Sequence, residues 1–150
     1  MKDLMVSKTF IKGYHIYKVK PSFGTRMSVE REPDNKYDPC ALVIKLRNEK
    51  MVGRVPANLC KIFSSFMQER KVLKISCVAV GAPTLSKHVE PQQSYRKQRQ
   101  RSGRDREGGG AVIPCKYVLQ CFDSCYSDVL ESLKNLLANP EMVGPVVEID

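Results

Sequence analysis

The residues with the clearest chemical potential lie in one short stretch, Arg31–Ala41, which reads Arg-Glu-Pro-Asp-Asn-Lys-Tyr-Asp-Pro-Cys-Ala. Pro33 fixes its own φ, and Pro39 restricts Asp38 to extended backbone, so the stretch predicts a stiff loop. A tyrosine ring and a carboxylate held on such a loop, Tyr37 and Asp38, suit the recognition of a ligand. The alternative is that Tyr37 packs flat on the fold and Asp38 accepts hydrogen bonds from turn amides.

Catalytic chemistry is not indicated by the residue types. His15 and His88 are the only two histidines, and Asp38 has no obvious partner carboxylate for acid and base work. The glycine run at 108–110 lacks the Lys-Ser/Thr and the strand-to-helix setting of a phosphate-binding loop. We therefore expect a protein that is not an enzyme and needs no cofactor.

The six cysteines lack the paired short spacings of a zinc or disulfide framework and fall mostly in apolar runs. They are Cys40, Cys60, Cys77, Cys115, Cys121 and Cys125. A metal site could be assembled only from Cys115, Cys121, Cys125 and the remote His88. Buried thiols are the better interpretation.

The composition is that of a basic globular protein. The 150 residues are 42% hydrophobic, and no run reaches the roughly 18 consecutive apolar residues of a membrane-spanning helix. The first eight residues lack an apolar signal core, so we expect an intracellular protein that is neither secreted nor bound to a membrane. The net charge of +9 is concentrated in residues 1–85, where 16 Lys/Arg face 7 Asp/Glu. A basic surface attracts phosphate polymers, which supports nucleic acid as a partner.

Strand-like and helix-like runs surround the central loop. Mixed β-branched and aromatic residues predict strands over 7–16 with a bulge or bend at Gly13, and over 26–31, 41–46, 51–56, 71–81 and 112–122. Apolar residues recur at intervals of three and four over 57–69 and about 126–138, so both segments are predicted helices. The tail from residue 141 to 150 is expected to be extended and weakly ordered.

A segment of different composition interrupts this order. Residues 82–111 contain prolines, glutamines, three consecutive glycines and six Lys/Arg between Tyr95 and Arg106, and they predict a disordered basic insertion. The insertion could contact nucleic acid through its basic side chains, act as a nuclear import signal or be only a solvated loop. We expect a barrel of residues 7–81 plus 112–122, then an accessory helix and tail over 123–150.

Five to seven short strands with one covering helix and no alternation of parallel strands with helices predict a mainly β fold. The expected fold is a small antiparallel barrel with helices as accessories. Small barrels of this kind often bind single strands on a basic face that carries aromatic side chains.

Three segments together resemble the HIRAN domain. They are Gly13-x-x-x-Tyr17, the loop Arg31–Ala41, and Met51-Val52-Gly53-Arg54-Val55-Pro56 before a helix. The resemblance covers roughly residues 7–81, with residues 112–122 as the last strand. It implies an OB-like barrel that captures the 3′-hydroxyl end of single-stranded DNA, in a nuclear role in DNA repair or replication-fork processing.

The resemblance also implies the site residues. The tyrosine at position 37 would stack on the terminal base and Asp38 would accept a hydrogen bond from the 3′-hydroxyl, with Asn35 beside them. Members of the family carry Arg-Tyr-Tyr where this chain has His15-Ile16-Tyr17, they carry His where it has Arg54, and they carry a lysine pair where it has Pro56-Ala57. The expected DNA-binding set is Asn35, Tyr37 and Asp38, with Tyr14, His15, Tyr17, Arg31 and Arg54 around them.

Two other functions remain open from the sequence. The first is a protein-interaction scaffold that kept the barrel, lost the pocket and docks a partner or a second copy through its leucine-rich C-terminal helix. The second is general nucleic-acid binding through the basic insertion alone. The oligomeric state is left undetermined, and the location is expected to be the nucleus or otherwise the cytoplasm.

Overall fold

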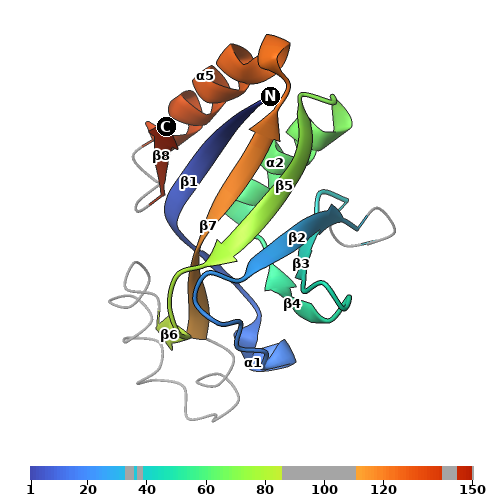
Figure 1. Ribbon diagram of the computed structural model, residues 1–150, viewed down its shortest axis with the longest axis vertical. Helices are drawn as coiled ribbons and strands as arrows, with labels where there is room; N and C mark the ends of the chain where they lie inside the picture. Colours follow the sequence, from blue (N-terminus) through green and yellow to red (C-terminus); the bar gives the residue numbers. More distant parts are fainter. Residues whose placement is uncertain (33–35, 37–38, 86–110, 140–144, 150) are drawn as a thin grey trace.

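One curved antiparallel sheet organises the chain in the computed structural model, which describes residues 1–32, 36, 39–85, 111–139 and 145–149 (Figure 1). Its strands follow the order β4-β3-β2-β5-β7-β1-β8, and the short β6 pairs with β7. The strands are β1 (Lys2–Ile11), β2 (Arg26–Arg31), β3 (Leu42–Lys45), β4 (Met51–Arg54), β5 (Val72–Ala79), β6 (Thr84–Leu85), β7 (Ala111–Cys121) and β8 (Val146–Ile149). The prediction of a mainly β, antiparallel, OB-like fold is confirmed.

The sheet is a half-barrel whose two sides meet at a single residue pair. Lys12, just after β1, and Arg54, at the end of β4, exchange two backbone hydrogen bonds, with N to O distances of 3.0 and 2.9 Å. These bonds connect the first and fourth strands, which are separated by four others in the sheet order. The approach is so close that a side chain at Gly53 would overlap the Lys12 carbonyl oxygen.

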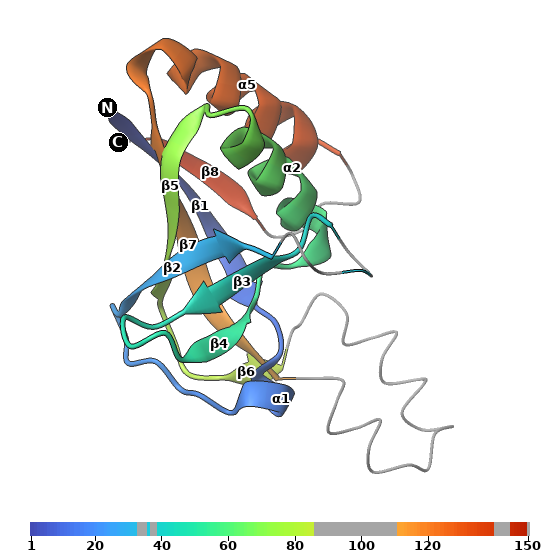
Figure 2. The same ribbon diagram turned by 90° about the vertical axis from the view of Figure 1, so that its right-hand side faces the viewer.

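Two amphipathic helices cover the same side of the sheet (Figure 2). Both helices were predicted from the spacing of their apolar residues. They are α2 (Ala57–Gln68) and α5 (Tyr126–Leu137), the latter after a 3-10 turn over Asp123–Cys125. Helix α2 buries Phe63, whose ring packs edge to face on Tyr117 of β7 at 5.4 Å between centroids. The phenol of Tyr117 donates a hydrogen bond to the Phe10 carbonyl oxygen at 2.9 Å, which satisfies its only polar group inside the core.

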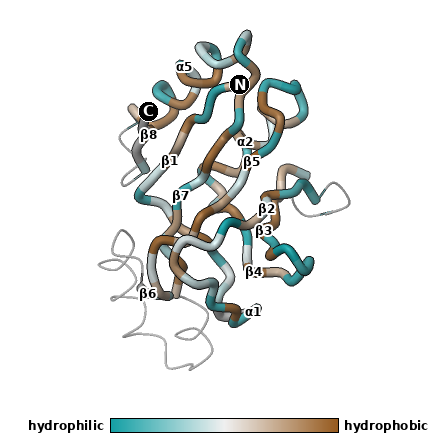
Figure 3. Tube along the Cα trace, viewed as in Figure 1, coloured by the Kyte–Doolittle hydropathy of each residue, from teal (hydrophilic) through white to brown (hydrophobic). Residues whose placement is uncertain are grey.

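Apolar and hydrophilic residues occupy different parts of the sheet. Apolar residues recur along β1, β5 and β7, whereas the turn between β3 and β4 is hydrophilic (Figure 3). Four of the six cysteines, Cys60, Cys77, Cys115 and Cys121, are buried, and Cys40 and Cys125 are half-buried. All six are free thiols, as predicted. Burial raises the pKa of Cys121 to about 11, so this thiol stays protonated at neutral pH.

The N-terminal prediction was wrong in its boundaries. Strand β1 begins at Lys2 instead of residue 7, because Leu4 and Val6 alternate into the core while Asp3, Met5 and Ser7 are less buried. Lys8 has a φ of 57°, and the pairing with β7 shifts between Val6 and Thr9, so the bulge precedes the predicted position. The bend at Gly13 is confirmed by a φ of 100°, but the chain then forms the short helix α1 (Tyr14–Tyr17) instead of continuing as strand.

The other predicted boundaries agree within a few residues. Strand β7 lies beside β5, with Cys77 opposite Tyr117, as expected for the closing strand. Residues 146–149 of the extended tail form β8 on the edge of β1, with Leu4 opposite Ile149. The predicted basic insertion covers residues 82–111, of which 86–110 lie outside the described residues. At its two ends the prediction of disorder was wrong, because Thr84 and Leu85 form β6 and Ala111 begins β7.

The described part of the chain contains neither a metal-ligating cluster nor a membrane-spanning helix. Among the described residues, no three His, Cys, Asp or Glu side chains are grouped to hold a metal ion, and His88 is outside them. None of the helices described is both long and apolar enough to cross a bilayer.

Candidate functional site

The pair that closes the half-barrel also assembles the candidate site. Arg54 ends β4, Tyr17 ends α1, and Glu32 follows β2 where the central loop leaves the sheet. Helix α1 lies against β4 in both views (Figures 1 and 2). Segments that are 15 to 37 residues apart along the chain therefore meet around one guanidinium group.

Arg54 forms an ion pair with Glu32. Its Nη1 donates to Glu32 Oε1 at 2.7 Å, and Nη2 approaches Oε2 at 3.5 Å. The Glu32 hydrogen bond is the main cause that raises the pKa of Arg54, and the Tyr17 hydroxyl adds smaller contributions. The arginine side chain is still 39% exposed, and Glu32 occupies two of its five N–H donors. The remaining donors can reach a phosphate or a base edge.

Helix α1 is held by the tight turn at Gly13. The Tyr17 amide donates to the Gly13 carbonyl oxygen at 3.1 Å, and an added Cβ at Gly13 would come within 3.3 Å of the Tyr17 ring. Tyr17 is half-buried beside Arg54, whereas Tyr14 packs against the hydrophobic core. Of the two tyrosines in α1, Tyr17 is therefore the better placed to contact a ligand. His15 belongs to the same helix.

The base of the central loop is anchored on two sides. The Glu32 amide donates to the Ala41 carbonyl oxygen at 3.0 Å, continuing the β2–β3 ladder that pairs Arg31 with Leu42. The Cys60 thiol of α2 lies 2.6 Å from the carbonyl oxygen of Cys40, which ties the returning end of the loop to the covering helix. The loop therefore starts and ends beside Arg54.

The structure brings together part of the predicted site. Tyr17 and Arg54 are neighbours, and Arg31 is exposed at the end of β2, one residue from Glu32. Asn35, Tyr37 and Asp38 lie outside the described residues. The choice between a ligand pocket and a Tyr37 ring packed on the fold therefore stays a prediction. Glu32 was not predicted as a site residue, because its contact with Arg54 depends on strand register and no local motif indicates it.

A small antiparallel half-barrel with a cation and an aromatic side chain at its closure point belongs to the class of OB-like modules. The family model described as the HIRAN domain matches residues 5–91, more than half of the chain. The chain therefore belongs to the HIRAN domain family, whose domain is a non-catalytic DNA-binding module.

Solved structures agree with this fold. The crystal structure of the HIRAN domain of human HLTF is similar with a TM-score of 0.62 and 14% identity, over 90% of this chain and 93% of that chain. The NMR structure of the HLTF HIRAN domain has a TM-score of 0.58 and 15% identity, over 87% of each chain. No curated protein sequence matches the chain.

Proposed function

We propose that this protein binds single-stranded DNA at a free 3′-hydroxyl end, without catalysing a reaction on it. The central loop provides Asn35, Tyr37 and Asp38, and the closure point provides Tyr17 and Arg54. Tyr37 stacks on the terminal base, which is worth about 1–3 kcal/mol per base. Asp38 accepts the hydrogen bond of the terminal hydroxyl.

The single observation that carries the proposal is the contact of Arg54 with both Glu32 and Tyr17. It connects the two ends of the predicted site, the 14–17 segment and the base of the 31–41 loop, which the sequence alone leaves unconnected. A cation at that point offers donors to the phosphate next to a terminal nucleotide. Lys12, which pairs with Arg54 at the closure point, is exposed, and so are Arg31 at the end of β2 and Lys36 in the loop that follows. These three side chains add positive charge to this part of the chain.

End selectivity follows from the charge of one side chain. A carboxylate accepts a hydrogen bond from a hydroxyl group, but it repels the phosphate that would replace this hydroxyl in a continuing strand or a 3′-phosphorylated end. Hydrogen bonds to charged groups contribute about 1.5–3 kcal/mol, so we expect a preference for the free hydroxyl of at least about tenfold.

The first prediction concerns this preference and its loss in Asp38→Ala. Fluorescence anisotropy with a labelled ten-nucleotide oligothymidine compares a free 3′-hydroxyl with a 3′-phosphate. The wild type should prefer the hydroxyl, and Asp38→Ala should bind both ends equally. Arg54→Ala should weaken the binding of both ends by about tenfold or more, because it removes a donor to the phosphate.

Matched controls separate the pocket from its alternatives. Asp123→Ala removes a carboxylate that is 71% exposed, from the turn before α5, and should leave the preference unchanged. A variant lacking residues 86–110 should keep the preference as well. Equal affinity of the wild type for both ends would overturn the end pocket: loss of binding on deletion would then indicate a basic loop alone, and no binding at all would indicate a protein-interaction module.

The proposal extends to a nuclear role in DNA repair or replication-fork processing, with the basic run between Arg96 and Arg106 as an import signal. A fluorescent fusion of the full chain should accumulate in the nucleus of a eukaryotic cell, whereas the fusion lacking residues 86–110 should distribute evenly. Because small proteins diffuse through nuclear pores, the fusion partner must be large enough to require active import. Identical distributions of the two fusions would contradict the import signal and leave DNA binding untouched.

A further inference from the structure

We infer that a second nucleotide-binding subsite lies between the turn before β2 and the β3–β4 hairpin, formed by Phe23, Arg26, Leu46 and Arg47. It holds an internal nucleotide of single-stranded nucleic acid, with the phosphate on the two arginines and the base on the apolar side chains. This inference rests on the proposed function, because the nucleotide in the subsite belongs to a strand whose end is held at the end pocket. The subsite itself does not require a free 3′-hydroxyl.

An open pocket marks the position. It is lined by Thr25 and Arg26 from the start of β2 and by Leu46, Arg47 and Asn48 from the hairpin. The ladder that pairs Ser28 with Lys45 runs antiparallel, so continuing it by two residues brings Arg26 opposite Arg47. Arg26 and Arg47 therefore line one concavity, together with Leu46, which packs against the core.

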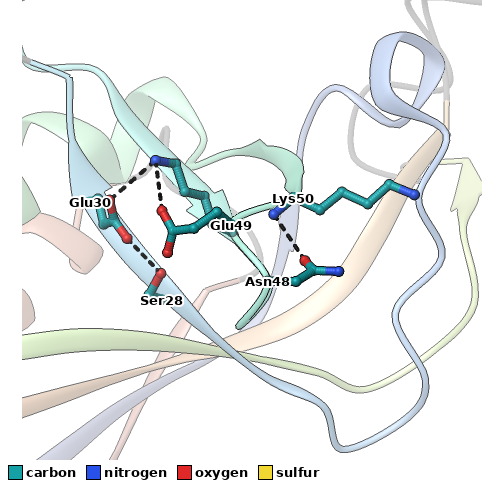
Figure 4. A network of polar contacts seen from close by, with 6 residues as sticks. Ser28, Glu30, Asn48, Glu49 and Lys50 are labelled. Atoms are coloured by element: carbon teal, nitrogen blue, oxygen red, sulfur yellow. Dashed lines mark hydrogen bonds and ion pairs between the residues drawn. The ribbon is translucent and has the colours of Figure 1, made fainter.

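These arginines lack acidic partners among the described residues, although carboxylates are close in sequence. The ammonium of Lys45 instead takes both neighbouring carboxylates, Glu30 at 3.4 Å and Glu49 at 3.5 Å (Figure 4). Ser28 donates a further hydrogen bond to Glu30 at 3.0 Å. Both carboxylates therefore pair with Lys45, and they do not neutralise Arg26 or Arg47. The two arginines can bind an anion. A phosphate is the anion that a planar guanidinium binds best.

The hairpin that carries Arg47 is ordered by its own contacts. The amide of Lys50 donates to Asn48 Oδ1 at 3.0 Å (Figure 4). The Leu46 amide donates to the Lys50 carbonyl oxygen at 2.9 Å. A rigid turn loses less conformational entropy when it binds a ligand. The pocket is therefore formed before a ligand arrives.

An exposed aromatic side chain, Phe23, lies two residues before Thr25, which lines this pocket. Phe23 is 79% exposed, the most exposed of the large hydrophobic side chains that the structure describes. Its turn is fixed by three hydrogen bonds: Gly24 donates to Ala79 at 2.8 Å, Ala79 to Thr25 at 3.2 Å, and Thr25 to Ser22 at 3.0 Å. Leaving Phe23 in water on a fixed turn, three residues before Arg26, costs hydrophobic free energy, and stacking on a base recovers it.

The spacing to the closure point suits one continuous strand. Leu42–Lys45 of β3 runs from the base of the central loop to the hairpin, and a rise of about 3.3 Å per residue puts about 10 Å between its ends. The two sites are thus separated by a distance that a few nucleotides span. A strand held by its end beside Arg54 reaches Arg26 and Arg47 with its interior.

The test uses the full chain and three probes: a thymidine dinucleotide with a 3′-hydroxyl, a ten-nucleotide oligothymidine with a 3′-phosphate, and the same length of abasic backbone. The double variant Arg26→Ala/Arg47→Ala should lose about tenfold or more in affinity for the 3′-phosphorylated oligothymidine and for the abasic strand. Its affinity for the dinucleotide should stay unchanged. The dependence of log K on log salt should fall by about 0.7 for each phosphate contact removed.

The aromatic contact is tested separately. Phe23→Ala should weaken the oligothymidine by about fivefold or more and leave the abasic strand unaffected, because only a base can stack. The controls are Lys61→Ala, an exposed cation on α2, and Leu73→Ala, an apolar side chain of β5 that is 56% exposed. Both should behave as wild type.

The outcomes distinguish this subsite from the end pocket. If the double variant and Lys61→Ala bound the oligothymidine with equal affinity, the subsite would be overturned, even if the 3′-hydroxyl preference were present. Loss in the double variant without any 3′-hydroxyl preference would keep the subsite and overturn the end pocket. Failure of the wild type to bind any of the three probes would overturn both.

Discussion

Replacing Gly53 with alanine is expected to lower the free energy of unfolding by about 3 kcal/mol, an effect at the upper end for an added methyl group. The new Cβ would overlap the backbone carbonyl oxygen of Lys12 and come within 2.5 Å of Ile11 Cγ2. A backbone atom cannot move aside as the end of a flexible side chain can. The two hydrogen bonds between Lys12 and Arg54 would have to lengthen or break, and the half-barrel would open at its closure point.

Urea denaturation followed by circular dichroism measures this change as a shift in midpoint. Gly81→Ala is the matched control, because its nearest contact would be a Pro114 ring atom at an ordinary 3.4 Å. It should change the unfolding free energy by less than about 1 kcal/mol. Similar midpoints for the two variants would show that strands β1 and β4 do not need this close approach. Gly53→Ala should also weaken DNA binding at temperatures where it stays folded, because it displaces Arg54.

The second large effect is expected for Phe63→Ala, which should lower the free energy of unfolding by about 3–5 kcal/mol. Phe63 is completely buried in α2, and its ring meets the edge of Tyr117. Truncation leaves a cavity between the helix and the sheet and removes the aromatic contact, worth about 0.5–1.5 kcal/mol beyond the buried area. The remaining structure can fill little of that space, because the Tyr117 hydroxyl is bonded to Phe10.

Ile62→Ala is the control within the same helix. Ile62 is adjacent in sequence but half-buried, so the substitution should cost about 1 kcal/mol. Thermal unfolding by calorimetry would compare the two variants on one scale. If both variants lost the same stability, the contribution of α2 would not come from the packing of one face of the helix on β7.

The elements with strong periodicity were the ones that the sequence predicted well. Leu59, Phe63 and Phe66 place a buried stripe on α2, and Met27 and Val29 alternate into the core from β2. The first strand was mispredicted because its five N-terminal residues include two charges, which hide the alternation of Leu4 and Val6. What decides the start of β1 is its pairing with β7, more than 100 residues away.

The candidate site was predictable only in part, for the same reason. Tyr17 and Arg54 were expected near the loop through a family resemblance, and the structure shows that they are neighbours. The contact of Arg54 with Glu32 and the close approach at Gly53 arise from the closure of the sheet, which no local pattern indicates. The contributions of Asn35, Tyr37 and Asp38 stay predictions from the sequence.

The pairing of β6 with the start of β7 has a consequence for how this fold can vary. Thr84 lies opposite Val112 and Leu85 opposite Ala111, so the chain leaves the sheet and re-enters it at adjacent positions. A segment whose ends are already joined can change in length at little cost, since doubling a flexible connection adds only about 0.6 kcal/mol of closure entropy. This hairpin is therefore a grafting point, where the barrel can gain, lose or exchange an appendage, natural or engineered, while the strands that carry Arg54 and Arg26 keep their register.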